Sequence, residues 1–251
     1  MIDRSRITDI CVVDDYNGSE AGTAIDINYC NVYDLSSSVD AVGAPKSTLG
    51  ETFMNVAGNG RPETLAQAPS GSGHDCFLKG IIVNANIYAS RNWWVQFQRY
   101  HFSDIISSQS TMHTINHLAS ISDKELTRMV SAYTSPKTIE LIKRITQLYV
   151  KPSSIETIGQ RQSLLMDLGF HKDKAIEYAE NNSKFFEVLV HNLPQGIKIG
   201  ARVTMNYLQL KTIVAQREGH KLREWLGFLV WAKTLPYANV LIFKEGKNGK
   251  R

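Results

Sequence analysis

Short runs of β-branched and aromatic residues occur in residues 1–40 and 76–89 of the chain. The segments ITDICVV (7–13) and AIDINYCNVYDL (24–35) are of this kind, and NGSEAG between them is a turn signal. A third apolar run, CFLKGIIVNANIYA (76–89), follows the turn PSGSGHD (69–75). These patterns predict β-strands in the N-terminal third of the protein.

From residue 114 to 191 the pattern changes to apolar residues at every third or fourth position, which is typical of amphipathic helices. Ser122 and Ser135 suit helix starts, and Pro152 marks a break. Lys and Glu occupy the outward positions, so these helices carry no readable chemistry. The predicted helical segments are 123–133, 135–150, 154–169 and 173–193.

The stretch Trp93 to His113 is polar in an unusual way. Its apolar spacing, which begins with Trp93 and Phe97, predicts a helix with one buried face, yet the stretch contains neither Lys nor Glu. It offers short or planar groups that make directional hydrogen bonds. Its one permanent cation, Arg99, suits planar or anionic ligands. Two interpretations remain open: the wall of a pocket, or a core helix whose polar groups satisfy the neighbouring backbone.

A second informative block covers residues 193–236. The turn LPQG and the segment IGARVTMN lead into a helix that runs to about Arg217, and REWLGFLVWAKTL is a further helix closed by Pro236. By the helical period, Asn206 and Arg217 fall on one partly apolar face. They either frame a flat ligand, or form a buried Asn satisfied by backbone together with a surface Arg. This predicted face consists of Asn206, Leu210, Ile213 or Val214, and Arg217.

Composition narrows the class of protein. The 251 residues are 43% hydrophobic and 21% charged, which is ordinary for a globular protein. The net charge of +4 arises partly from the C-terminal tail, so it favours anionic ligands slightly and does not predict a nucleic-acid-coating surface. Three cysteines without a CxxC spacing indicate no zinc or other metal site and no disulfide framework. The sequence has no apolar run long enough to span a membrane and no apolar signal-peptide core, so we expect a cytoplasmic protein.

These features predict a single α+β domain over residues 1–251. We expect residues 41–73, which are rich in Gly and Pro, to be loops around one short helix near Thr48–Asn55. The tail 244–251 is expected to be disordered. His74 and Asp75 precede the third predicted strand, where they are either a structural cap or part of a site.

The first polar block resembles the signature region of the flavin-dependent thymidylate synthases. Gln96 and Arg99 fall on the family's Gln-x-x-Arg, in which Gln lines the nucleotide site and Arg reaches the flavin. The other matching positions carry changed residues. Tyr100 and His101 take the places of a His and a second Arg, Ser108 or Ser110 takes the place of a phosphate-binding Ser, and Met112 and His113 occupy the positions of an Arg-Tyr pair.

The second block resembles the same family more closely. In the family, Thr-x-Asn leads into a helix with an Arg eleven residues after the Asn. By this resemblance Asn206 is a flavin-site residue, and Arg217 lies against the nucleotide base and helps to activate it. Leu208 and Thr212 depart from the pattern, since the family has Arg and a second Asn there. The order of the family's motif is reproduced by Thr204-Met205-Asn206, Leu210, Arg217, His220 and Glu224-Trp225.

The resemblance implies an α+β fold with an antiparallel or mixed sheet flanked by a helical bundle. It also implies a homotetrameric flavoprotein that methylates dUMP to dTMP with FAD, NADPH and methylenetetrahydrofolate. Arg217 would be the catalytic residue. The cofactor-binding residues implied are Arg99, Tyr100, His101, Asn206 and Thr212, and the nucleotide-binding residues are Gln96, Ser108, Ser110, Arg217 and His220.

Two alternatives remain open at this point. The replaced signature residues fit methyl or hydroxymethyl transfer to another pyrimidine nucleotide, such as dCMP. They also fit a non-catalytic relative that binds flavin or nucleotide.

Overall fold

The computed structural model describes residues 8–18, 22–46, 61–69 and 71–243. The chain divides into two compact units. Unit 1 contains the described residues of Met1–Ala89, Trp93–Ser108 and Gly200–Arg251, and unit 2 contains Ser90–Asn92 and Gln109–Ile199. The expected single-domain organisation stays a prediction. The short helix predicted near Thr48–Asn55 and the tail 244–251 lie outside the described residues.

Unit 1 is built around a β-sheet with the strand order β1-β3-β4-β6-β5, in which β2 also pairs with β3. The pairs β1–β3, β2–β3, β3–β4 and β5–β6 are antiparallel. The predicted α+β class is confirmed. The strands are β1 (Ile10–Val13), β2 (Tyr16–Asn17), β3 (Asp26–Tyr33), β4 (Ile82–Ser90), β5 (Asp104–Ser108) and β6 (Lys198–Asn206).

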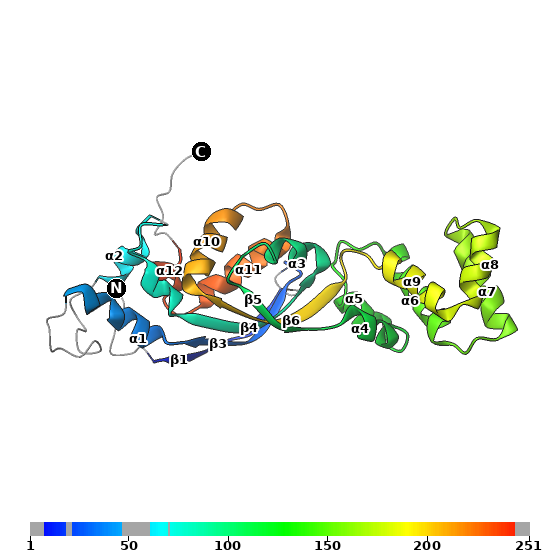
Figure 1. Ribbon diagram of the computed structural model, residues 1–251, viewed down its shortest axis with the longest axis horizontal. Coiled ribbons are helices and arrows are strands. Elements are labelled where there is room, and N and C mark those ends of the chain that lie inside the picture. Colours follow the sequence, from blue (N-terminus) through cyan, green and yellow to red (C-terminus); the bar gives the residue numbers. More distant parts are fainter. Residues whose placement is uncertain (1–7, 19–21, 47–60, 70, 244–251) are drawn as a thin grey trace. The chain divides into compact units, whose positions relative to one another are not determined.

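One face of this sheet carries the core of unit 1. Alternate residues of β4, such as Val83 and Ile87, are buried, while the residues between them are partly exposed. Helices α3 (Arg91–Phe97), α10 (Tyr207–Arg217) and α11 (Arg223–Thr234) lie on the same side of the sheet (Figure 1). The close approach of α11 needs Gly227, because a Cβ there would come within 2.5 Å of the Ile25 side chain.

An aromatic cluster joins α3 to α11. The ring centroid of Trp93 lies 4.7 Å from that of Phe97 and 4.9 Å from that of Trp225. Phe228 connects the cluster to Trp231, at 5.1 Å between centroids. Large buried rings contribute much apolar area to a core, so this cluster fixes the end of α3 against α11.

Short elements complete unit 1. They are α1 (Leu35–Asp40), η2 (Ala41–Lys46), α2 (Pro62–Ala66), η4 (Cys76–Lys79) and α12 (Ala238–Leu241).

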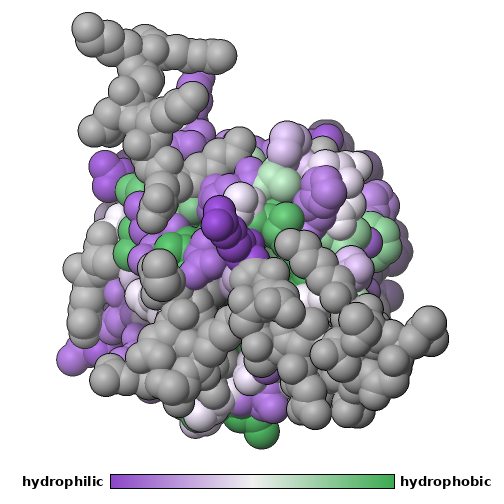
Figure 2. All heavy atoms as spheres, turned by 90° about the vertical axis from the view of Figure 1, so that its left-hand side faces the viewer, coloured by the Kyte–Doolittle hydropathy of each residue, from purple (hydrophilic) through white to green (hydrophobic). Residues whose placement is uncertain are grey.

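The visible part of the face in Figure 2 mixes hydrophilic and hydrophobic residues. Within the described parts of the chain, every helix is too short or too polar to cross a membrane.

Unit 2 is helical, as the spacing of its apolar residues predicts. Ser122 starts a helix with a capping box to Glu125, and the Ser135 hydroxyl accepts from the backbone N–H of Thr138, so both predicted helix starts are confirmed. The last predicted segment is two helices, because Asn181 ends one and caps the next. The helices are α4 (Thr111–Leu118), α5 (Asp123–Arg128), α6 (Pro136–Val150), α7 (Ile155–Asp167), α8 (Lys172–Glu180) and α9 (Asn182–Asn192).

Two predicted elements were wrong. The stretch 93–113 is not one helix: α3 ends at Phe97, a turn follows, and residues 104–108 form β5, paired with β6. Pairing with a distant strand overrides the local helical spacing here. The third predicted strand begins later than residue 76, because residues 76–79 form the single turn η4 before β4.

Candidate functional site

A cavity of about 640 Å³ lies in unit 1 beside α10. This volume is typical of small-molecule sites. The cavity is built from three separate segments of the sequence: η4, the turn after α3, and one side of α10. Its described lining residues are Lys79, Arg99, Tyr100, His101, Phe102, Asn206, Leu208, Gln209, Thr212, Gln216 and Arg217.

Arg217 connects the two polar blocks of the sequence. Its Nε donates to the Tyr100 hydroxyl at 2.6 Å, and its Nη1 donates to the Gln96 side-chain oxygen at 3.1 Å. The guanidinium carbon lies 4.3 Å from the centre of the Trp225 ring and 5.3 Å from that of Tyr100. Two neutral acceptors and two aromatic faces therefore orient the guanidinium without neutralising its charge.

Gln96 lies behind Arg217 as a second positioning group. Its carbonyl oxygen also accepts from the Trp225 indole N–H at 2.8 Å. Two donors on one oxygen fix the direction of the amide plane, since that oxygen has two lone pairs. The amide nitrogen of Gln96 has no protein partner among the described residues, so it remains able to donate to a ligand.

The start of α10 is fixed by a capping box. The Asn206 side chain accepts from the backbone N–H of Gln209 at 3.0 Å, and the Gln209 side chain accepts from the backbone N–H of Asn206 at 3.0 Å. Gln209 also donates to the backbone carbonyl of His101 at 2.9 Å. The helix start and the turn after α3 are thereby held together at the cavity.

The face of α10 that lines the cavity differs from the predicted one. Leu210, Ile213 and Val214 are buried in the core, so the apolar middle of the predicted face points away from the ligand space. Asn206 and Arg217 do line the cavity, at either end of the helix. The Asn206 side chain is satisfied by a backbone N–H, as one interpretation proposed, but the residue is only partly buried and also lines the cavity.

The cavity is positively charged. Lys79, Arg99 and Arg217 are cations, and none of the described lining residues is acidic. A site walled in this way favours an anionic ligand, because no carboxylate competes for the cations. Among the described residues, no three His, Cys, Asp or Glu side chains are arranged to hold a metal ion.

His220 lies in the loop after α10, close to the charged end of that helix. Burial, and after it the charge of Arg217, lowers the pKa of His220 below its ordinary value. Its Nδ1 accepts from the backbone N–H of Leu222 at 3.0 Å, which also suits the neutral ring. Burial and the charge of Arg217 thus favour the neutral form of the His220 ring.

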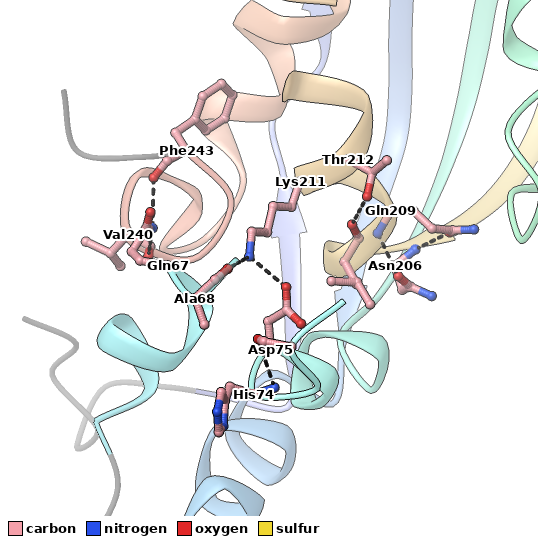
Figure 3. A network of polar contacts seen from close by, with 12 residues as sticks. Gln67, Ala68, His74, Asp75, Asn206, Gln209, Lys211, Thr212, Val240 and Phe243 are labelled. Carbon is pink, nitrogen blue, oxygen red and sulfur yellow. Dashed lines mark hydrogen bonds and ion pairs between the residues drawn. The ribbon is translucent and has the colours of Figure 1, made fainter. Parts of the chain in front are cut away.

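A buried ion pair supports the far side of α10. The Lys211 ammonium lies 2.7 Å from the Asp75 carboxylate, and the two side chains are only 6% and 3% exposed. The same ammonium donates to the backbone carbonyl of Ala68 at 2.9 Å, so it joins two points of the segment before η4 to α10 (Figure 3). This contact holds η4, and with it Lys79, beside the cavity.

The ion pair also settles the role of Asp75. Its side chain makes no capping hydrogen bond to η4, so the predicted cap was wrong. His74 is exposed, and its backbone N–H meets the Ser72 hydroxyl at 3.4 Å. Asp75 is structural, as one of the two interpretations proposed, but it acts through Lys211.

The other predicted site residues fall into two groups. Gln96 accepts a hydrogen bond from Arg217 but is not among the lining residues. Ser108 at the end of β5, Ser110 at the start of α4 and His220 are not among them either. The remaining predicted residues line the cavity, and they are Arg99, Tyr100, His101, Asn206, Thr212 and Arg217.

Several lining residues are not indicated by the sequence patterns described above. Lys79 was assigned to a strand, although it ends the turn η4. Gln209 and Gln216 flank Thr212 at three- and four-residue spacing, and this helical spacing of polar residues was the signal that could have found them. Leu208 was noticed only as a departure from the family pattern. Phe102 was embedded in the predicted helix.

Comparisons with known proteins bear on the fold. No protein-family model matches the sequence, and no curated protein matches it. The structure is similar to that of thymidylate synthase X (ThyX) from Helicobacter pylori, solved with FAD and dUMP. The TM-score is 0.53 at 12% sequence identity, and the match covers 88% of this chain and 97% of that chain.

A second solved structure is flavin-dependent thymidylate synthase ThyX from Helicobacter pylori complexed with FAD and dUMP. It matches with a TM-score of 0.48 at 16% identity, and covers 83% of this chain and 94% of that chain. The first of these similarities shows that the chain has the fold of a flavin-dependent thymidylate synthase.

Proposed function

We propose that this protein is a flavin-dependent enzyme that methylates a pyrimidine deoxynucleotide, converting dUMP to dTMP with methylenetetrahydrofolate and NADPH. The observation that carries the proposal is Arg217, which is oriented by Tyr100, Gln96 and Trp225 at the edge of a cavity lined by cations. The fold shared with a structure solved with FAD and dUMP supports the same assignment.

Arg217 suits the stabilisation of charge on a pyrimidine carbonyl. Among the described residues its Nη2 group has no protein partner, so this end of the guanidinium is able to donate to a ligand oxygen. A preoriented donor at a developing negative charge typically contributes about 10²- to 10³-fold in rate. Arg217 is thus the proposed catalytic residue. It binds the pyrimidine base and stabilises the negative charge on the carbonyl oxygen of that base.

The cavity fits a flavin cofactor. Its volume suits a large planar ligand, and its cations suit the phosphates that FAD carries. When bound, a reduced flavin supplies hydride for the reaction. The residues proposed to hold it are Arg99, Tyr100, His101, Asn206 and Thr212, which all line the cavity.

Two of the family's polar flavin contacts are changed in this chain. Leu208 lines the cavity where the family has Arg, and the Thr212 hydroxyl donates to the backbone carbonyl of Leu208 at 3.1 Å. Lys79, which also lines the cavity, is a cation that compensates for the missing charge at Leu208 in this proposal. Lys79 offsets one lost cation, and the distribution of positive charge in the site differs.

For the nucleotide we propose Gln96, Ser108, Ser110 and His220 together with Arg217. Gln96 is the strongest of these candidates, because its oxygen is saturated by Arg217 and Trp225 while its amide nitrogen is left for a ligand. Ser108 and Ser110 are exposed hydroxyls. The family's homotetramer, in which several subunits build each site, is part of the proposal.

The changed signature residues support a second candidate function. Tyr100 takes the place of a His and is committed to Arg217, and Met112 and His113 are exposed side chains where the family has an Arg-Tyr pair. A changed nucleotide-binding loop favours a different pyrimidine substrate. The second candidate is therefore methyl or hydroxymethyl transfer to dCMP, with a non-catalytic flavin-binding relative as the third.

The test is tritium release from 5-tritiated nucleotides. The full-length protein is supplied with FAD, NADPH and methylenetetrahydrofolate, and either dUMP or dCMP labelled at carbon 5. Release from dUMP is expected and supports the proposal. Release from dCMP alone would establish the second candidate, and bound flavin without release from either nucleotide would establish the non-catalytic relative.

A matched pair of variants assigns any release to the site. Arg217→Met removes the proposed catalytic guanidinium, and Arg223→Met removes an exposed arginine of α11 that is not among the lining residues. We expect release to fall about 10²- to 10³-fold in the first variant only. An equal fall in both variants would contradict the role of Arg217.

A further inference from the structure

Phe102 combines two unfavourable features at one position. Its φ is 75°, in the left-handed region that bulky side chains rarely occupy. Its side chain is also 83% exposed, although it is a large apolar ring. Both features cost free energy in the isolated protein, and both occur in a residue that lines the cavity. Strained residues cluster at ligand sites, where the surrounding structure holds them in place.

The surrounding structure fixes the backbone on both sides of Phe102. On one side the carbonyl of His101 accepts from Gln209 of α10 at 2.9 Å. On the other side the backbone N–H of Ser103 meets the Tyr100 carbonyl at 3.4 Å, and β5 begins at Asp104. A change of the Phe102 backbone to negative φ would therefore break these contacts.

Phe102 is also the apolar aromatic ring among the described lining residues that remains open to a ligand. The other two aromatic rings among the described lining residues are those of Tyr100 and His101; Tyr100 holds Arg217 with its hydroxyl and lies beneath the guanidinium, and His101 has a polar ring. The ring of Tyr100 is already occupied by protein contacts. The exposed ring of Phe102 has no such partner in the described structure.

We infer that Phe102 is a ligand-positioning residue that stacks on the isoalloxazine ring of the bound flavin. The inference rests on the proposed flavin site and adds a contact that no motif of the sequence indicates. A ring held outside the core at the cavity wall offers a flat apolar surface to a flat ligand. The bound flavin in turn covers the ring of Phe102 and so removes its apolar surface from water.

The chain provides a matched control. Tyr29, in β3, is another aromatic residue with positive φ, at 49°, and is 72% exposed. It lies at the irregularity in the pairing of β3 with β4 and is not among the residues lining the cavity. Substitutions at Tyr29 reproduce the loss of an exposed, strained aromatic side chain without touching the proposed site.

The experiment compares thermal stability with flavin binding in the full-length protein. The variants are Phe102→Gly, Phe102→Ala and Phe102→Trp, with Tyr29→Gly and Tyr29→Ala as controls. Riboflavin and FAD are titrated separately, because they share the isoalloxazine ring and only FAD carries adenine. The Tm of each variant is measured without ligand.

The two readouts should separate at Phe102. Phe102→Gly should melt higher than Phe102→Ala, since glycine adopts positive φ without strain. Both variants should bind riboflavin and FAD about tenfold more weakly than the natural protein, whereas Phe102→Trp should bind both with nearly natural affinity. The Tyr29 variants should show the same difference in Tm and unchanged flavin affinity.

Other outcomes overturn the inference. Unchanged riboflavin affinity in Phe102→Ala would exclude stacking on the isoalloxazine ring, even if FAD binding fell. An equal loss of affinity in Tyr29→Ala would show a general effect of the substitution. If the natural protein binds neither flavin, the proposed function itself fails; if it binds both and Phe102→Ala does too, only the role of Phe102 fails.

Discussion

Two arginines, one in each unit, lie over aromatic rings and differ in almost everything else. Arg161 of α7 is 0% exposed and stands 4.7 Å above the Phe185 ring. Its guanidinium donates twice to the Leu148 carbonyl, at 2.8 and 3.0 Å, and to further oxygens nearby. These further acceptors are the carbonyls of Tyr149, Lys151 and Ala179, the side-chain oxygen of Asn182 and the Ser153 hydroxyl.

Arg217 of α10 is half-buried, and its protein partners are a phenol and an amide. Arg161 uses its donors to satisfy the carbonyls at the end of α6 and α8, where no further helical partner exists. Arg217 keeps donors open toward a cavity. Contact with aromatic rings is common to both arginines, so it does not identify a structural arginine; complete burial and saturated donors distinguish Arg161 from Arg217.

The largest expected effect on stability is at Arg161. Arg161→Met leaves several buried carbonyls without a donor, so the free energy of unfolding should fall by about 3–5 kcal/mol. Urea unfolding followed by far-UV circular dichroism measures the change. Arg144→Met is the control, because Arg144 is an exposed arginine of α6 whose ion pair with Asp167 spans 3.8 Å. If the two variants lose equal stability, the structural role of Arg161 is wrong.

Lys211 is an intermediate case, a buried cation with a charged partner. Lys211→Met strands the Asp75 carboxylate and should also lower the free energy of unfolding by about 3–5 kcal/mol. The double variant Lys211→Met with Asp75→Leu removes both charges and should recover most of that loss. Denaturant unfolding of the natural protein, Lys211→Met and the double variant measures both changes in the free energy of unfolding. A double variant no more stable than Lys211→Met would show that packing, and not charge pairing, is what the ion pair contributes.

Arg217 should show the opposite balance of effects. Since it is half-buried and its partners can be hydrated, Arg217→Lys should change the free energy of unfolding by less than about 1 kcal/mol. Binding of dUMP to the flavin-loaded protein should fall by tenfold or more, because lysine cannot reproduce the planar fork. Calorimetric titration measures the binding. A variant that binds normally but unfolds easily would place Arg217 with Arg161 as a structural residue.

The smallest expected effect concerns pH. The pKa of His220 is lowered in the folded protein, so the unfolded state takes up the proton first as pH falls through about 6.5. Stability should therefore decrease slightly below that pH and be unaffected by His220 above it. His220→Asn should flatten this part of the pH profile of Tm. A profile that keeps its full slope in the variant would assign the pH dependence to other groups.

Most helices of unit 2 could be predicted because their signals are local. Apolar spacing marks α5 to α9, although it gives neither the break between α8 and α9 nor α4. Ser122 and Ser135 mark two of the starts within three residues of the groups they cap. The strand β5 could not be predicted in this way. Its adjacent residues Ile105 and Ile106 fit a helix or a strand, and its partner β6 lies about a hundred residues further along the chain.

Helical spacing predicted one part of the candidate site, the two ends of α10. Asn206 caps the start of α10 and Arg217 ends that helix, and both line the cavity. The ion pair between Asp75 and Lys211 joins residues 136 positions apart, and nothing near either residue indicates the other. Phe102 was hidden for a different reason, since only the backbone conformation shows that its ring leaves the core.

The most direct test of the proposed flavin site is equilibrium titration of FAD into the protein at low and high salt. We expect saturable binding that weakens as salt rises, because Lys79, Arg99 and Arg217 line the cavity and none of the described lining residues is acidic. Failure to bind FAD at either salt concentration, or binding that salt does not affect, would contradict the account of this cavity as a site for an anionic flavin.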